Sequence, residues 1–84
     1  MNNVIAVFAN RSFAMQFASA LKRMGINSKV IDTPRDLSSA CGISILFAGR
    51  NLDKVKALIS RLRSTGTVRL YMITGDLFKK YLPI

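Results

Sequence analysis

Apolar residues recur along this chain with two different periods, and the change from one period to the other predicts its secondary structure. Three short segments are continuously or alternately apolar, as strands are: residues 4–8, 43–48 and 68–72. A further strand is predicted over residues 27–32, although Lys29 interrupts it. Two longer segments repeat apolar side chains at the i, i+3, i+4 spacing of an amphipathic helix: residues 13–24 and 52–62. The predicted element order is therefore βαββαβ.

Small polar residues and glycines delimit both predicted helices. Asn10 or Ser12 precedes the first helix and provides a side chain that caps its free N–H groups. Gly25 follows that helix, where a left-handed residue commonly ends one. Asn51 and Gly66 stand in the corresponding places around the second helix.

The βαββαβ order predicts an α+β fold, a ferredoxin-like sandwich in which two helices cover one face of a four-stranded antiparallel sheet. In that topology the first and third strands are central, and the second and fourth lie at the edges. The charges agree with this, because Lys29 and Arg69 fall in the two predicted edge strands while the central strands carry none. Charged side chains on edge strands oppose unwanted pairing with other strands.

The C-terminal residues 76–84 form an apolar and basic tail after a single domain predicted over residues 1–75. Four of its side chains are large and apolar: Leu77, Phe78, Tyr81 and Leu82. We expect a helical turn here that buries these side chains on its own domain or on a second copy of the chain. A homo-oligomer therefore remains open.

Composition narrows the environment and the partners of the chain. The 84 residues suffice for one core and not for two. No apolar run is long enough to span a membrane, and the first residues lack the features of a secretory leader. One cysteine and no histidine leave neither a disulfide nor a zinc site, so we predict no metal, no cofactor and a cytoplasmic location.

The charge balance is strongly basic, with 13 Lys and Arg against four acidic residues and a net charge of +9. Such a chain is attracted to acidic partners, of which RNA is one. The basic residues are spread along the chain rather than clustered. The same charge therefore also fits simple solubility of a chain that is half apolar.

The connection between the second and third predicted strands, Thr33–Gly42, is unusually long. Hairpin loops normally take two to five residues, whereas this one takes ten. Thr33 and Pro34 predict a short helical turn, with Thr33 as its cap. Cys41, the only thiol of the chain, then lies just before the central third strand, and Gly42 allows close approach of a ligand or of backbone.

Topology predicts what surrounds Cys41. The connection lies at the end of the sheet where the first helix begins, so we expect Cys41 to lie near the first helical turn. That turn starts with Asn10, Arg11 and Ser12. Its N–H groups and dipole favour an anion, and with the positive charge of Arg35 they would lower the pKa of the thiol.

The run Pro34-Arg35-Asp36-Leu37-Ser38-Ser39-Ala40-Cys41-Gly42 resembles the motif of a bacterial family of selenium/sulfur carrier-like proteins. The resemblance extends weakly from Val4 to Met72, and Ala40 stands where a glycine is common. It implies a carrier that holds a persulfide or selenosulfide on Cys41, with Arg35, Ser39 and Gly42 shaping the site. A donor such as a cysteine desulfurase would load it and an acceptor enzyme would unload it, so it would not be an enzyme by itself.

An alternative interpretation treats the cysteine as structural. A free cysteine is often only a small buried apolar residue. The chain would then be a basic RNA- or protein-binding module of ferredoxin-like fold with a structural cysteine. Binding of RNA on the sheet needs aromatic side chains for base stacking, and Tyr71 is the only aromatic residue in a predicted edge strand. Hydrolase chemistry is disfavoured, because no histidine is present to activate a serine.

Overall fold

The computed structural model describes residues 3–37, 42–61, 68–75 and 80–84. Within them lie two α-helices, one 3-10 helix and five strands. In chain order these are β1 (Asn3–Phe8), α1 (Arg11–Arg23), β2 (Ser28–Asp32), β3 (Ile43–Ala48), η1 (Gly49–Asn51), α2 (Leu52–Arg61), β4 (Val68–Thr74) and β5 (Lys80–Pro83).

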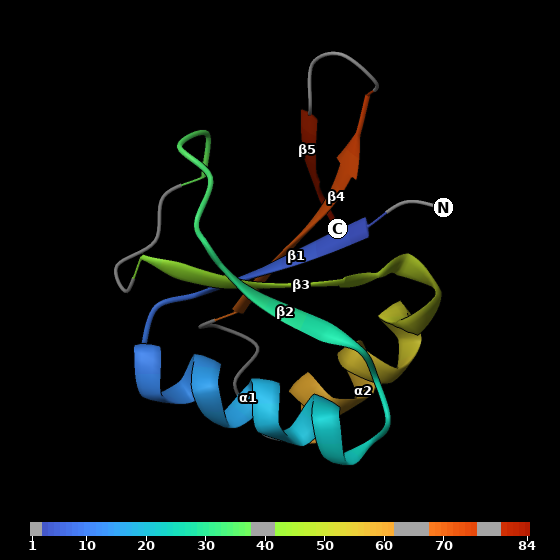
Figure 1. Cartoon of the computed structure of the whole chain (residues 1–84). Coiled ribbons are helices and arrows are strands. Elements are labelled where there is room, and N and C mark those ends of the chain that lie inside the picture. The colour runs from blue at the N-terminus through green and yellow to red at the C-terminus, as the bar shows by residue number, and fades with distance from the viewer. Residues whose placement is uncertain (1–2, 38–41, 62–67, 76–79) are drawn as a thin grey trace.

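The strands form one antiparallel sheet in the order β2-β3-β1-β4-β5, and both helices lie against the same face of it (Figure 1). The prediction of an α+β fold is confirmed, as are the interior positions of β1 and β3. Their apolar sequences follow from that position, because an interior strand beneath helices has little contact with water.

The prediction of a four-stranded sheet is wrong, because β5 pairs with the outer side of β4. The tail forms a strand over Lys80–Pro83 rather than a helical turn there, while Leu77 and Phe78 lie outside the described residues. Strand β4 is consequently not an edge strand. Its pairing with the C-terminal segment extends from Thr74 to Leu70, so the charged Arg69 lies just beyond the part of β4 that gains a second neighbour.

The core lies between the sheet and the two helices. It contains alternate residues of the interior strands and one face of each helix: Val4, Ala6, Phe8, Ile45 and Phe47 from β1 and β3, Ala14, Phe17 and Leu21 from α1, and Val55, Leu58 and Ile59 from α2. The ring of Phe17 lies 5.2 Å from that of Phe8, centroid to centroid. The periods found in the sequence therefore identify the faces that are buried.

The ends of α1 follow the sequence closely. Asn10 is the N-cap, since its side-chain oxygen accepts a hydrogen bond of 2.9 Å from the Phe13 N–H. Gly25 follows the helix with a φ of 76°, the left-handed conformation expected of it. Asn51 belongs to η1, which leads directly into α2, and Gly66 lies outside the described residues. None of the described helices is long and apolar enough to cross a membrane.

The helix-free face of the sheet is also apolar at its centre. Residues paired across an antiparallel sheet point to the same face, so the register places Ile5, Val7 and Ser44 opposite the helices. All three are buried, with 4% exposure or less. The centre of this face is therefore shielded from solvent. On β4 and β5, Tyr71 and Tyr81 point to the same face.

Candidate functional site

The two ends of the Thr33–Gly42 connection are hydrogen-bonded to each other where they leave the sheet. We call the contacts of Thr33 with Gly42 and Ser44 the neck of the connection. The Thr33 N–H donates a hydrogen bond of 3.0 Å to the Gly42 carbonyl oxygen, which continues the β2–β3 register by one further pair. The hydroxyl oxygens of Thr33 and Ser44 lie 2.7 Å apart in a second hydrogen bond. Ser44 is fully buried, so its hydroxyl needs this partner, and the two contacts fix where the connection begins and ends.

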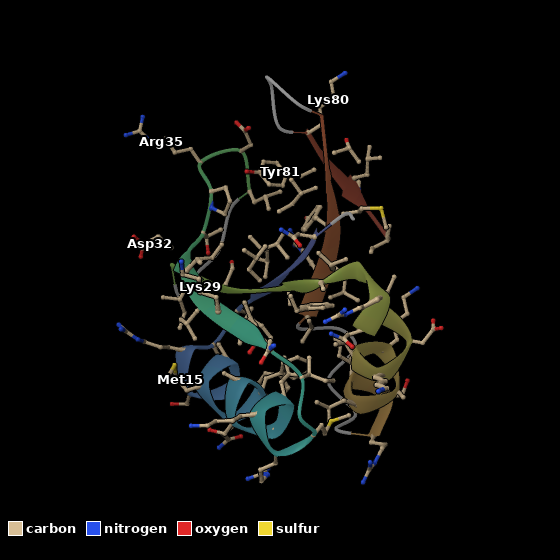
Figure 2. The ribbon with its side chains drawn as sticks, turned by 45° about the vertical axis from the view of Figure 1, so that its right-hand side comes forward. Met15, Lys29, Asp32, Arg35, Lys80 and Tyr81 are labelled. Carbon is tan, nitrogen blue, oxygen red and sulfur yellow. The ribbon has the colours of Figure 1, made fainter. Side chains whose placement is uncertain are left out.

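Beyond the neck the chain makes a turn over Pro34–Leu37. The Leu37 N–H donates to the Pro34 carbonyl oxygen at 3.0 Å, which leaves Arg35 and Asp36 at the central, exposed positions. The predicted helical cap at Thr33 is wrong, because the Thr33 hydroxyl bonds to Ser44 and the segment forms a turn. Arg35 is thus presented outward by the turn (Figure 2).

Gly42 has a conformational reason to be glycine. Its φ is 76°, in the left-handed region that other residues adopt only with strain. A Cβ atom placed on it would meet no heavy atom of the described residues within 4 Å. The backbone turn into β3, rather than lack of space, therefore requires a glycine beside Cys41.

Residues 33–37 and the paired ends of β4 and β5 both project from the sheet on the side away from the helices (Figure 1). Tyr81 points from β5 toward the connection (Figure 2) and is half-buried. The sequence did not indicate this, because a helical tail gives no reason to place Tyr81 beside residues 33–37. The register of β5 against β4, which pairs Tyr81 with Ile73, orients the Tyr81 side chain.

The structure separates Arg35 from the other predicted site residues at the start of the first helix, Asn10, Arg11 and Ser12. Arg35 lies far from the start of α1, on the other side of the sheet, in both views (Figures 1 and 2). Arg11 and Ser12 are exposed in the first turn of α1, and Asn10 already accepts the Phe13 N–H. One of the N–H groups expected to stabilise a thiolate is therefore occupied by the cap.

The strand register brings the start of β3, which follows Gly42, beside the end of β1, which precedes α1, because Ser44 pairs with Val7. Cys41 and Ser39 lie outside the described residues. Within the described ranges no group of three or more His, Cys, Asp or Glu side chains is arranged to hold a metal ion.

The comparisons with known proteins agree with the motif. A model of the family described as "Putative Se/S carrier protein-like" matches residues 3–64, and the chain belongs to that family. The match includes the whole Thr33–Gly42 connection and ends before β4 and β5. No curated protein and no solved structure matches the chain.

Proposed function

We propose that this protein carries sulfur or selenium on Cys41 as a persulfide or selenosulfide and transfers it between a donor and an acceptor enzyme. Membership of the selenium/sulfur carrier-like family over residues 3–64, with Cys41 inside the matched motif, is the observation that carries the proposal. Cys41 is also the only thiol of the chain, so no other residue can form a persulfide.

The loading step is a thiol exchange in which no net oxidation occurs. The Cys41 thiolate attacks the terminal sulfur of a persulfide held on the donor, a new S–S bond forms on Cys41, and the old S–S bond breaks. The donor thiolate leaves with the electron pair of that bond. An acceptor thiolate then removes the terminal sulfur in the same way. A cysteine desulfurase is the class of donor that supplies such a persulfide from cysteine.

The anchored neck of the connection supports this chemistry. The carbonyl of Gly42, the residue after Cys41, accepts a hydrogen bond from the Thr33 N–H, which joins the end of the connection to the end of β2. Arg35 lies in the same connection and carries a positive charge on an exposed turn. We assign to it the role of lowering the pKa of the thiol and attracting an acidic donor surface.

Binding of RNA on the sheet is less well supported by the helix-free face. Stacking requires aromatic side chains on the central strands, whereas β1 presents the buried Ile5 and Val7 there. Tyr71 and Tyr81 lie to one side, on β4 and β5. The chain is basic enough for salt-dependent attraction to RNA, but this face offers no central stacking platform.

The proposal is tested by reaction of the thiol. The protein is incubated with a persulfide donor, a cysteine desulfurase with cysteine, and its intact mass is measured. We expect a gain of about 32 Da, one sulfur atom, that a reductant removes. Alkylation by iodoacetamide is measured in parallel at pH 6–7, where a thiol of lowered pKa reacts faster than an ordinary one.

Two variants make this test specific. We expect Cys41→Ser to remove both the mass gain and the alkylation and to leave the fold unchanged. Circular dichroism checks the fold. Adding Ser60→Cys to Cys41→Ser moves the thiol to an exposed position on α2 and gives the rate of an ordinary exposed cysteine. If the wild-type thiol gains no sulfur and reacts no faster than the thiol at position 60, the carrier function is wrong.

A further inference from the structure

The two edges of the sheet differ in their capacity to pair with another strand. In an antiparallel pair, alternate residues direct their N–H and C=O groups to the partner and the others direct them away. The Ile84 N–H donates to Leu70, so in β5 the even-numbered residues bond to β4 and Pro83 faces outward. Proline has no N–H, and the outer edge of β5 therefore lacks a donor at Pro83, its last residue.

The outer edge of β2 has no such defect. The Thr33 N–H donates to Gly42, so the odd-numbered residues of β2 bond to β3. Ser28, Val30 and Asp32 consequently direct their N–H and C=O groups outward, and no described strand pairs with them. An edge that keeps all its donors and acceptors is a template for a further strand.

A groove with a mixed apolar and polar lining runs beside this edge on the helix side of the sheet. It has a volume of about 430 Å³ between α1 and β2, and its apolar lining includes Met15, Ala18, Ile26 and Val30. Met15 is 48% exposed and Val30 42%, which is high for large apolar side chains. Figure 2 shows Met15, Lys29 and Asp32 along this one side of the molecule.

We propose that the β2 edge pairs with the β2 edge of a second copy of this chain, antiparallel, with Val30 on the two-fold axis. In this register Val30 pairs with Val30 of the other copy, and Ser28 pairs with Asp32 of the other copy. The outward N–H and C=O groups of all three residues are then bonded. The two sheets join into one, with the helices of both copies on the same face.

The charges and the proline select this register over its neighbours. A shift by one pair in one direction places Lys29 opposite Lys29 of the other copy, which is a repulsive pair. A shift in the other direction places Pro34, which has no N–H, opposite Ser28. Shifts by a single residue are excluded as well, because they bring inward-bonded residues opposite outward ones.

The proposed register is also complementary in charge. Asp32 of one copy comes to the Ser28 end of the groove of the other, which Lys22 lines. Within the described part of the chain no ion pair involves Asp32, so its carboxylate is available to Lys22. In a chain of net charge +9, β2 contains one acidic and one basic residue, so the paired strands themselves add no net charge to the interface.

The test is sedimentation equilibrium of the full chain from micromolar to millimolar concentration. We expect a monomer–dimer equilibrium and a dissociation constant raised about tenfold or more by Val30→Asp, which places two carboxylates together at the axis. Leu82→Asp is the matched control, because Leu82 is 50% exposed on the other edge strand and should leave the equilibrium unchanged. A chain that stays monomeric throughout, or equal effects of the two variants, would overturn the proposal.

Two further measurements test the register itself. Hydrogen exchange should slow with rising concentration at the Ser28, Val30 and Asp32 amides and not at Leu82. Lys22→Glu and Asp32→Lys should each weaken the dimer, and the double variant should restore it by reversing the ion pair. Weakening that persists in the double variant, or unchanged exchange at Val30 in a dimer, would overturn this register.

Discussion

The helix-covered core and the Thr33–Gly42 connection are held together in opposite ways. In the core, β1 and β3 pack fully buried apolar side chains against Phe17 and its neighbours, so many contacts share the stabilisation. Among its described residues, the connection is attached by a backbone hydrogen bond and a hydroxyl pair, and it exposes Arg35 and Asp36 beyond them. The difference indicates that stability resides in one region and the proposed chemistry in the other, so substitutions should separate them.

The largest effect should come from the core. Phe17→Ala removes a fully buried ring that lies against Phe8, and we expect it to cost about 3–5 kcal/mol of the free energy of unfolding. Urea denaturation measures this loss. The alkylation rate of Cys41 in the remaining folded protein should stay as in the wild type. A change in that rate at temperatures where the variant is folded would contradict the separation of the two regions.

The parts of this core that the sequence predicts are those set by local patterns. Charge-free apolar runs identify β1 and β3, and the spacing of Phe17 and Leu21 identifies α1. The Asn10 cap and the left-handed Gly25 are likewise properties of a few neighbouring residues. Each of these features depends on interactions within about one helical turn or along one strand, which is why periodicity is enough to find them.

The parts that could not be predicted depend on pairing between distant segments. Strand β5 is short, and the spacing of apolar residues in the tail fits a helix equally well, so only its register against β4 decides. The Thr33–Ser44 hydroxyl pair requires the β2–β3 register in the same way. The charge of Arg69 predicted β4 as an edge strand. That prediction failed because Arg69 lies at the one end of β4 that β5 does not reach.

The second prediction addresses the neck of the connection. Ser44→Ala leaves the Thr33 hydroxyl without its partner beside a buried position, and we expect a loss of about 1–3 kcal/mol in the free energy of unfolding. Thr33→Val together with Ser44→Ala removes both hydroxyls and should restore part of that loss. Additive losses in this double-mutant cycle, measured by urea denaturation, would show that the pair does not couple the two strands.

The third prediction compares two glycines of the same conformation. Gly25 and Gly42 both have a φ of 76° and open space around the missing Cβ, so Gly25→Ala and Gly42→Ala should each cost about 1–2 kcal/mol from backbone strain alone. Only Gly42→Ala should change the alkylation rate of Cys41, because only Gly42 is beside the thiol. Equal rates in the two variants would mean that the conformation at Gly42 does not position Cys41.

The smallest change in stability, and the sharpest test of the site, comes from two exposed arginines. Arg35→Gln and Arg11→Gln should leave the free energy of unfolding unchanged, because both side chains are exposed.

Arg35→Gln should slow alkylation of Cys41 at neutral pH about twofold, since loss of a positive charge in the same connection raises the pKa of the thiol. The difference should shrink as salt is added, because salt screens charges at an exposed site. Helix α1, which begins at Arg11, lies on the other side of the sheet from the Pro34–Leu37 turn, so Arg11→Gln should have no effect. Slowing by Arg11→Gln and not by Arg35→Gln would instead place the thiol under the influence of the first turn of α1, and the role assigned to Arg35 would be wrong.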